Sequence, residues 1–226
     1  DRRGDEVVYL TLANKISIDP FDYTTRDTPL ITWGEFYNRP LFHHLPLYPF
    51  MLSIAIRLFG SSTTNATLVN IVAHTITLIF VFLIAKELYN DKVALLASGF
   101  MAFDPLGLIL ADRIWIDATL MLSLTASYYF FLKGKNSEKN YYLSGLFLGF
   151  ALLTKAVVYS MILIYLALLK FRVQRVHIKM FLLSMAIFSP WILWNLKLGL
   201  NPFSFSYYQV SEGWMEIAIA PWYTSL

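Results

Sequence analysis

One uninterrupted apolar run limits what this chain can fold into. Residues 66–85, ATLVNIVAHTITLIFVFLIA, carry no formal charge, and a helix of that length rises about 30 Å, the thickness of a bilayer's hydrocarbon core. The composition agrees, since 57% of the 226 residues are hydrophobic and only 15% are charged, against roughly 25% charged in soluble domains. We therefore expect an all-α, polytopic membrane helical bundle.

Several classes of protein are excluded by what the sequence lacks. A net charge of +3 is too small and too scattered for a nucleic-acid binder. The chain has no cysteine, which excludes disulfide scaffolds, thiol catalysis and cysteine-ligated zinc. It also has no GxSxG, no phosphate loop ending in Lys-Ser/Thr and no GxGxxG, so serine hydrolases, nucleotide hydrolases and dinucleotide enzymes have no support.

The pattern of apolar runs and basic loops predicts six membrane spans. Residues 141–169 contain one charge, Lys155, and are too long for a single upright span. The flanking loops, 133–140 and 170–179, are both rich in Lys and Arg, so the positive-inside rule puts both on the cytoplasmic face. We therefore predict two short helices that meet near Lys155 on the outer side. The six expected spans are 66–85, 93–111, 114–132, 141–154, 156–169 and 180–197.

This topology places the remaining segments outside the cytoplasm. Residues 1–65 form a first outer loop, and residues 198–226 form an outer tail. Within the loop, residues 47–60 are apolar but contain Arg57 and are too short to span, so we expect a helix lying in the headgroup plane. The chain then starts and stops outside the membrane, and we expect a fragment that lacks a preceding span and later spans.

The first candidate site is an acidic pair near the amino terminus. Asp5 and Glu6 adjoin in GDEVVY with no lysine beside them. Two carboxylates at an outer membrane surface suit general-base chemistry, because desolvation and mutual repulsion raise the pKa of one of them toward the working range. The alternative is an exposed acidic turn without a chemical role.

The second candidate site is the charged motif DRIWID at the head of the third span. Arg113 and Asp117 are four residues apart, so we expect them to share one helix face while Asp112 points elsewhere. An ionisable residue within an apolar span is costly and marks a functional site by default. The alternative is an ion pair that only locks the helix end.

Other isolated polar residues have functional and structural readings. Lys155 suits a phosphate as a point charge, or its amine reaches the headgroups by snorkelling. His43 and His44 are possible metal ligands, but adjacent histidines point apart on a helix and no HExxH-like spacing accompanies them. We therefore assign no metal ligand. A divalent metal is a possible cofactor, and we expect no other. His74 is better explained by a hydrogen bond within the bundle.

The order of several short motifs resembles the integral-membrane GT-C glycosyltransferases. The nearest branch is that of the protein O-mannosyltransferases and the lipid A aminoarabinose transferase. The motifs are DE with Tyr9 (5–9), HLPLYP (44–49), RLFG (57–60), AKELY (85–89), DRIWID (112–117), FALLTK (150–155) and PW (190–191). Each is weak alone, but their order and spacing together are fairly specific.

The resemblance implies an inverting transferase that moves a hexose or pentose from a polyprenyl-phosphate donor on the extracytoplasmic face. The family's first-loop acid is the base on the acceptor, which carries over to Asp5, with Glu6 as a helper. Arg113, Lys155 and His44 match positions near the donor phosphate, although Leu45 replaces a proline of the family's pattern.

Asp112, Asp117 and Tyr9 are assigned supporting roles. The expected partners are the lipid-linked sugar, membrane lipids and a protein, lipid or glycan acceptor, with no nucleic acid. The expected location is the plasma membrane of a prokaryote or the endoplasmic reticulum of a eukaryote. The alternative function is a transporter, a flippase or a non-catalytic lipid-binding protein, since such proteins also place charges in a bundle and break helices.

Overall fold

The computed structural model describes residues 5–24, 44–155 and 158–197, and the regular structure within these ranges is helical. The all-α membrane bundle expected from the sequence is confirmed. The predicted tail 198–226 and His43 lie outside the described residues. The helices are α1 (Asp5–Ile18), α2 (Leu47–Phe59), α3 (Thr63–Leu88), α4 (Asp91–Ala102), α5 (Pro105–Asp112), α6 (Asp117–Lys133), α7 (Glu138–Leu152), α8 (Tyr159–Leu168) and α9 (Arg175–Lys197).

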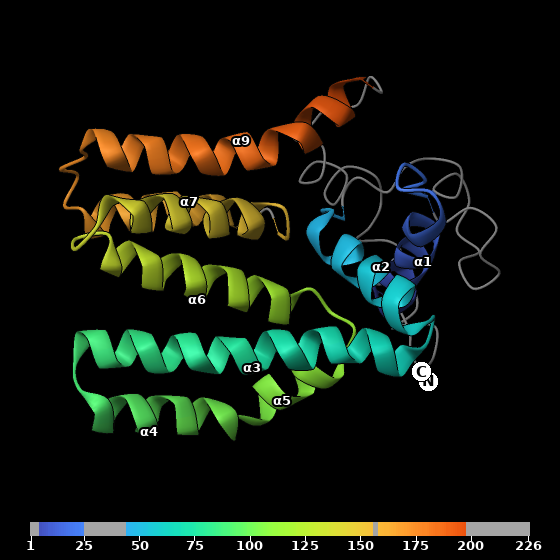
Figure 1. Ribbon diagram of the computed structural model, residues 1–226, viewed down its shortest axis with the longest axis horizontal. Helices are drawn as coiled ribbons and strands as arrows, with labels where there is room; N and C mark the ends of the chain where they lie inside the picture. The colour runs from blue at the N-terminus through green and yellow to red at the C-terminus, as the bar shows by residue number, and fades with distance from the viewer. Residues whose placement is uncertain (1–4, 25–43, 156–157, 198–226) are drawn as a thin grey trace, which may run out of the picture.

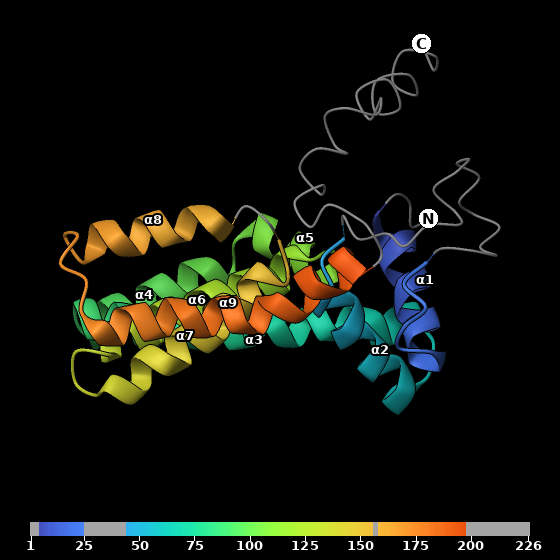
Figure 2. The same ribbon diagram turned by 90° about the horizontal axis from the view of Figure 1, so that it is seen from above.

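The longer helices lie side by side, and α1 and α2 pack across one end of them (Figure 1). Neighbours in this layer are α9, α7, α6, α3 and α4, in that order, while α8 lies over one face (Figure 2). Within the described residues, α3 and α9 are each long and apolar enough to cross a membrane. The other four expected spans stay predictions, since their helices are shorter.

The predicted span 93–111 is not one helix in the structure but two, α4 and α5. α4 ends at Ala102, α5 begins at Pro105, and the two are bent by 57°. Asp104 caps α5 by accepting a 2.6 Å hydrogen bond from the Gly107 N–H, and Pro105 occupies the first turn of α5, where it favours a new helix over a continuation of α4. Taken together, α4 and α5 are long and apolar enough for one broken span.

α7 and α9 approach each other at two glycines. A Cβ atom added to Gly145 would lie 2.4 Å from the backbone oxygen of Met180, and one added to Gly149 would lie 2.8 Å from Ile187. Small residues four apart let membrane helices come this close. The contact helps to hold α7, whose carboxyl end leads to Lys155.

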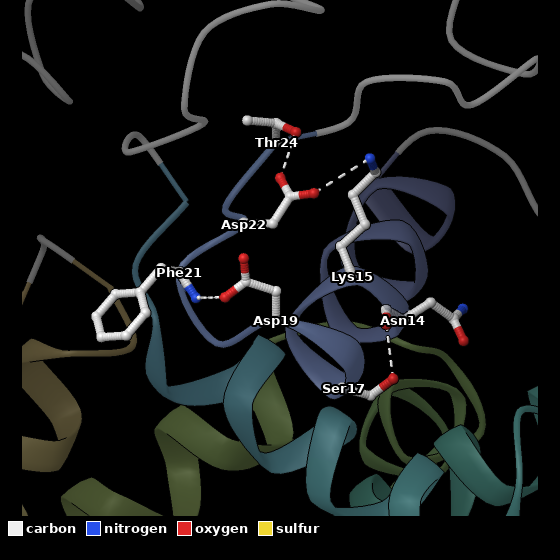
Figure 3. Close-up of polar contacts among 7 residues, drawn as sticks. All are labelled: Asn14, Lys15, Ser17, Asp19, Phe21, Asp22 and Thr24. Carbon is white, nitrogen blue, oxygen red and sulfur yellow. Dashed lines mark hydrogen bonds and ion pairs between the residues drawn. The ribbon is translucent and has the colours of Figure 1, made fainter.

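The carboxyl end of α1 is held by α2 and by its own following turn. Arg57 of α2 donates to the carbonyls of Ser17 (2.8 Å) and Ile16 (3.1 Å), which satisfies groups that a helix end leaves open. Figure 3 shows that turn, where Asp22 lies 3.4 Å from the Lys15 amine and accepts a 2.6 Å hydrogen bond from the Thr24 hydroxyl. α1 and α2 therefore form one packed unit.

The same turn connects α1 to the main bundle. Tyr23 is buried, and its ring lies edge-on to Trp191 of α9, with 5.1 Å between ring centroids. Its hydroxyl donates to the carbonyl of His44 at 2.9 Å. The N–H of Leu47 donates to the carbonyl of Leu153, which follows α7. These contacts fix the acidic amino end of α1 relative to the bundle.

Candidate active site

The residues singled out from the sequence meet where α1 packs on the bundle. They come from the amino end of α1, from residues 44–48, from the connection 113–116 between α5 and α6, and from the connection after α7. Tyr9, Tyr48 and Ile114 are buried in one apolar cluster at this junction. Charged side chains surround that cluster.

Glu6 is the buried member of the acidic pair. Only 1% of its side chain is exposed, and one carboxylate oxygen accepts a 3.0 Å hydrogen bond from the Ile114 N–H. The other oxygen lies 3.5 Å from the Arg113 guanidinium. The reading of this pair as an exposed acidic turn is therefore wrong for Glu6, whereas Asp5 is exposed at the first position of α1.

Arg113 projects from extended backbone and not from a helix. α5 ends at Asp112, and Arg113 has φ −97° and ψ 154°, so the expectation that Arg113 and Asp117 share a helix face is wrong. The guanidinium contacts Glu6 on one side, and 45% of the side chain is exposed. Asp112 is also exposed and, among the described residues, enters no ion pair.

Asp117 pairs with Lys155. The lysine amine lies 3.3 Å from the carboxylate, and 45% of the lysine side chain and 33% of the aspartate side chain are exposed. Asp117 begins α6, and Lys155 lies between α7 and α8, where we predicted a turn. The two cations assigned to the donor phosphate are thus each anchored by a carboxylate and each half-exposed.

Tyr9 lies at the centre of the junction. It is buried, its hydroxyl lies 3.2 Å from Nδ1 of His44, and its ring meets those of His44 and Tyr48 edge-on. Burial raises the pKa of Tyr9 well above its ordinary value, and the charges of Asp5 and Asp117 raise it further. The charges of both carboxylates therefore favour the neutral form of the Tyr9 phenol.

Burial lowers the pKa of His44 to about 4, so its imidazole is neutral at pH 7. A neutral imidazole offers a phosphate a hydrogen bond but no positive charge. Its role near the donor stays a prediction. Within the described ranges, no group of three or more His, Cys, Asp or Glu side chains is arranged to hold a metal ion.

Sequence reasoning missed Asn70, which binds the backbone of the DRIWID motif. Its side-chain amide on α3 is fully buried and donates to the carbonyls of Arg113 and, at 2.8 Å, Trp115. The signal was present, because an amide within an apolar run needs a partner. The identity of that partner depends on tertiary packing.

These observations define an integral membrane protein with a polar site at one end of a helical bundle. Residues 40–194, more than half of the chain, match the dolichyl-phosphate-mannose-protein mannosyltransferase family. The chain belongs to that family, which confirms the GT-C resemblance and makes the protein a membrane glycosyltransferase by family. Asp5 and Glu6 precede the matched residues. No curated protein and no solved structure matches the chain.

Proposed function

We propose that the chain transfers mannose from a dolichyl- or polyprenyl-phosphate donor to a protein hydroxyl on the extracytoplasmic face, with inversion at the anomeric carbon. The observation that carries this proposal is the Glu6–Arg113 pair, which links the first-loop acids to the DRIWID motif. Through it, the residue that follows the exposed Asp5 contacts the half-exposed guanidinium of Arg113.

Arg113 and Lys155 are the phosphate-binding cations of this proposal. As the bond between the sugar and the phosphate breaks, negative charge grows on the leaving lipid phosphate. Cations held in advance by Glu6 and Asp117 stabilise that charge with little reorganisation. The guanidinium binds phosphate oxygens as a fork, and the ammonium binds as a point charge.

Asp5 is the general base of the proposal. It accepts the proton of the acceptor hydroxyl while that oxygen attacks the anomeric carbon and the lipid phosphate leaves. Glu6 does not suit this step, because its two oxygens face the Ile114 N–H and Arg113 and its side chain is 1% exposed. A single displacement of this kind inverts the anomeric centre.

The test compares two Asp-to-Asn changes in the same segment. Asp5→Asn is expected to lower kcat for sugar transfer at least 100-fold, within the range seen for lost general bases. Asp19→Asn is the matched control, because Asp19 is exposed and its carboxylate accepts only the Phe21 N–H, which an Asn also satisfies. The measurement is transfer of mannose from the lipid-phosphate donor to a Ser/Thr peptide in proteoliposomes.

Equal activities of the two variants contradict the assignment of Asp5. A parent protein that transfers no sugar but moves a lipid or solute across the vesicle membrane contradicts the enzyme altogether, and supports the transporter or flippase alternative. That alternative has less support, since the two ion pairs lie at one end of the bundle and not at its middle.

A further inference from the structure

The backbone of residues 113–115 is held by side chains and not by a helix. Asn70 donates to the carbonyls of Arg113 and Trp115, while Glu6 accepts from the N–H of Ile114 between them. Ile114 itself is fully buried. Three consecutive residues are therefore fixed from two sides, by α3 and by α1.

The amide of Asn70 has the chemistry that this task needs. One NH2 group carries two hydrogens, so it can donate to two carbonyls at once. An aliphatic side chain or an ionised carboxylate has no hydrogen to donate. The reverse amide orientation would bring its oxygen against both carbonyl oxygens, so the donors must face them. Because Asn70 is fully buried, losing these bonds leaves two carbonyls without partners away from water.

The segment held by Asn70 carries one proposed phosphate-binding group and leads to the carboxylate that anchors the other. Arg113 is its first residue, and Asp117, which pairs with Lys155, begins the helix directly after it. Asn70 lies in α3, eight residues after the Ser62 cap of that helix. Its position behind the segment lets it set where the guanidinium projects.

We propose that Asn70 is a positioning residue, which holds the extended backbone of Arg113 and Trp115 so that Arg113 meets the donor phosphate in its reactive geometry. This rests on the proposed function for its catalytic consequence. Asn70 contacts no reacting atom and acts through Arg113.

The first experiment compares two buried asparagines. Asn195 of α9 is a matched control, because its buried amide donates a 2.7 Å bond only to the Trp191 carbonyl of its own helix. Asn70→Ala is expected to lower kcat about 10- to 100-fold more than Asn195→Ala does, with KM changed less than threefold. Asn70→Asp is expected to lower kcat at least as much as Asn70→Ala does, because the carboxylate oxygens would repel the two carbonyl oxygens that the amide now binds.

A second substitution separates positioning from general loss of stability. In an Arg113→Ala background, Asn70→Ala is expected to lower kcat less than twofold further, because the group it positions is gone. An additional tenfold loss there overturns the proposal, and so does an Asn70→Ala enzyme no worse than Asn195→Ala.

A third readout does not depend on catalysis. Backbone hydrogen exchange of the peptide covering residues 113–117 is expected to be at least tenfold faster in Asn70→Ala, with exchange in α9 unchanged. Unchanged exchange at 113–117 refutes the positioning role even if transfer is lost. If the parent transfers no sugar but this exchange accelerates, the proposed function fails while the backbone lock stands.

Discussion

Asp5 and Glu6 are adjacent, yet they lie in opposite surroundings. Successive residues of a helix point about 100° apart, so one turn of α1 exposes Asp5 and directs Glu6 to Ile114 and Arg113. A buried charge persists when it is paired and hydrogen-bonded. The division supports the proposal in which the exposed Asp5 is the general base and the buried Glu6 anchors Arg113.

The pair of Asp117 and Lys155 differs from that of Glu6 and Arg113. Both of its side chains are about one-third to one-half exposed, and a pair of this kind contributes about 1 kcal/mol or less to stability. The main effect of this pair is to hold the Lys155 amine at the end of the bundle. Arg113, by contrast, is held by a carboxylate that water does not reach.

His44 makes a prediction about stability and pH. Its pKa is about 4 in the folded protein, against 6.5 for a free imidazole, so between these values the unfolded chain binds more protons. Folding stability must therefore fall as the pH drops through this window. We expect the wild-type protein to lose about 2 kcal/mol between pH 8 and pH 5 that His44→Gln does not lose. Urea unfolding in detergent at both pH values measures the difference.

Tyr9→Phe is the control for this experiment. It removes the hydroxyl that contacts Nδ1 of His44 but keeps the ring that covers the imidazole. Because burial is the cause of the low pKa, the acid-dependent loss should persist in Tyr9→Phe. Equal losses in wild type and His44→Gln would show that another group is responsible.

At the scale of helices, the contact between α7 and α9 makes a graded prediction. Gly145→Ala sets a new methyl against backbone and should destabilise the protein by about 2–3 kcal/mol, whereas Gly149→Ala meets only the Ile187 side chain and should cost less. Gly99→Ala in α4 meets nothing within 4 Å and should stabilise by up to about 1 kcal/mol. Thermal unfolding in detergent ranks the four proteins.

The order expected is Gly99→Ala, wild type, Gly149→Ala and Gly145→Ala, from most to least stable. Gly99→Ala provides the internal control, because it applies the same substitution at a helical position with open space around it. A Gly145→Ala protein as stable as wild type would mean that α7 and α9 are farther apart than described.

Sequence patterns predict elements better than they predict pairings. The uncharged run 66–85 lies within α3, and 47–60 corresponds to α2, because apolar length and short breaks are local properties. α1 was not foreseen, since DEVVYLTLANKISI shows no dominant apolar face and its burial depends on α2. Local spacing also suggested that Arg113 pairs with Asp117, which the break after Asp112 prevents.

The site depends on contacts between residues far apart in the chain. Glu6 meets Arg113, Asn70 meets the same segment, and Asp117 meets Lys155. No sequence periodicity reports such distances, because they follow from how α1, α3 and α7 pack. The sequence indicated which residue types were unusual, and the fold determined which of them are partners.

At the scale of the whole molecule, basic loops and the candidate site lie at opposite ends. The carboxyl end of α3 and the α6–α7 and α8–α9 connections lie together at the left of Figure 1, and they carry Lys86, Lys135 and Arg172 among other cations. α1, α2 and the connection after α5 lie at the right. By the positive-inside rule, we expect the left end to be cytoplasmic and the site to be extracytoplasmic.

Two serine-to-cysteine changes test this orientation, since residues 1–226 contain no cysteine. Ser61, between α2 and α3, and Ser137, at the start of α7, are both exposed and lie at opposite ends of the bundle. In sealed vesicles with the extracytoplasmic face outward, a membrane-impermeant maleimide should label Ser61→Cys at once. Ser137→Cys should react only after the vesicles are permeabilised.

The orientation follows from this comparison because both cysteines are equally small changes on exposed turns, so a difference in labelling reports sidedness and not reactivity. Labelling after permeabilisation provides the control, since it must reach both positions. The reverse pattern would put the candidate site in the cytoplasm and contradict an extracytoplasmic lipid-linked donor. Labelling of both positions in sealed vesicles would mean that the bundle does not separate them across the membrane. The expected pattern leaves Asp5, Arg113 and Lys155 on the face where the proposed transfer takes place.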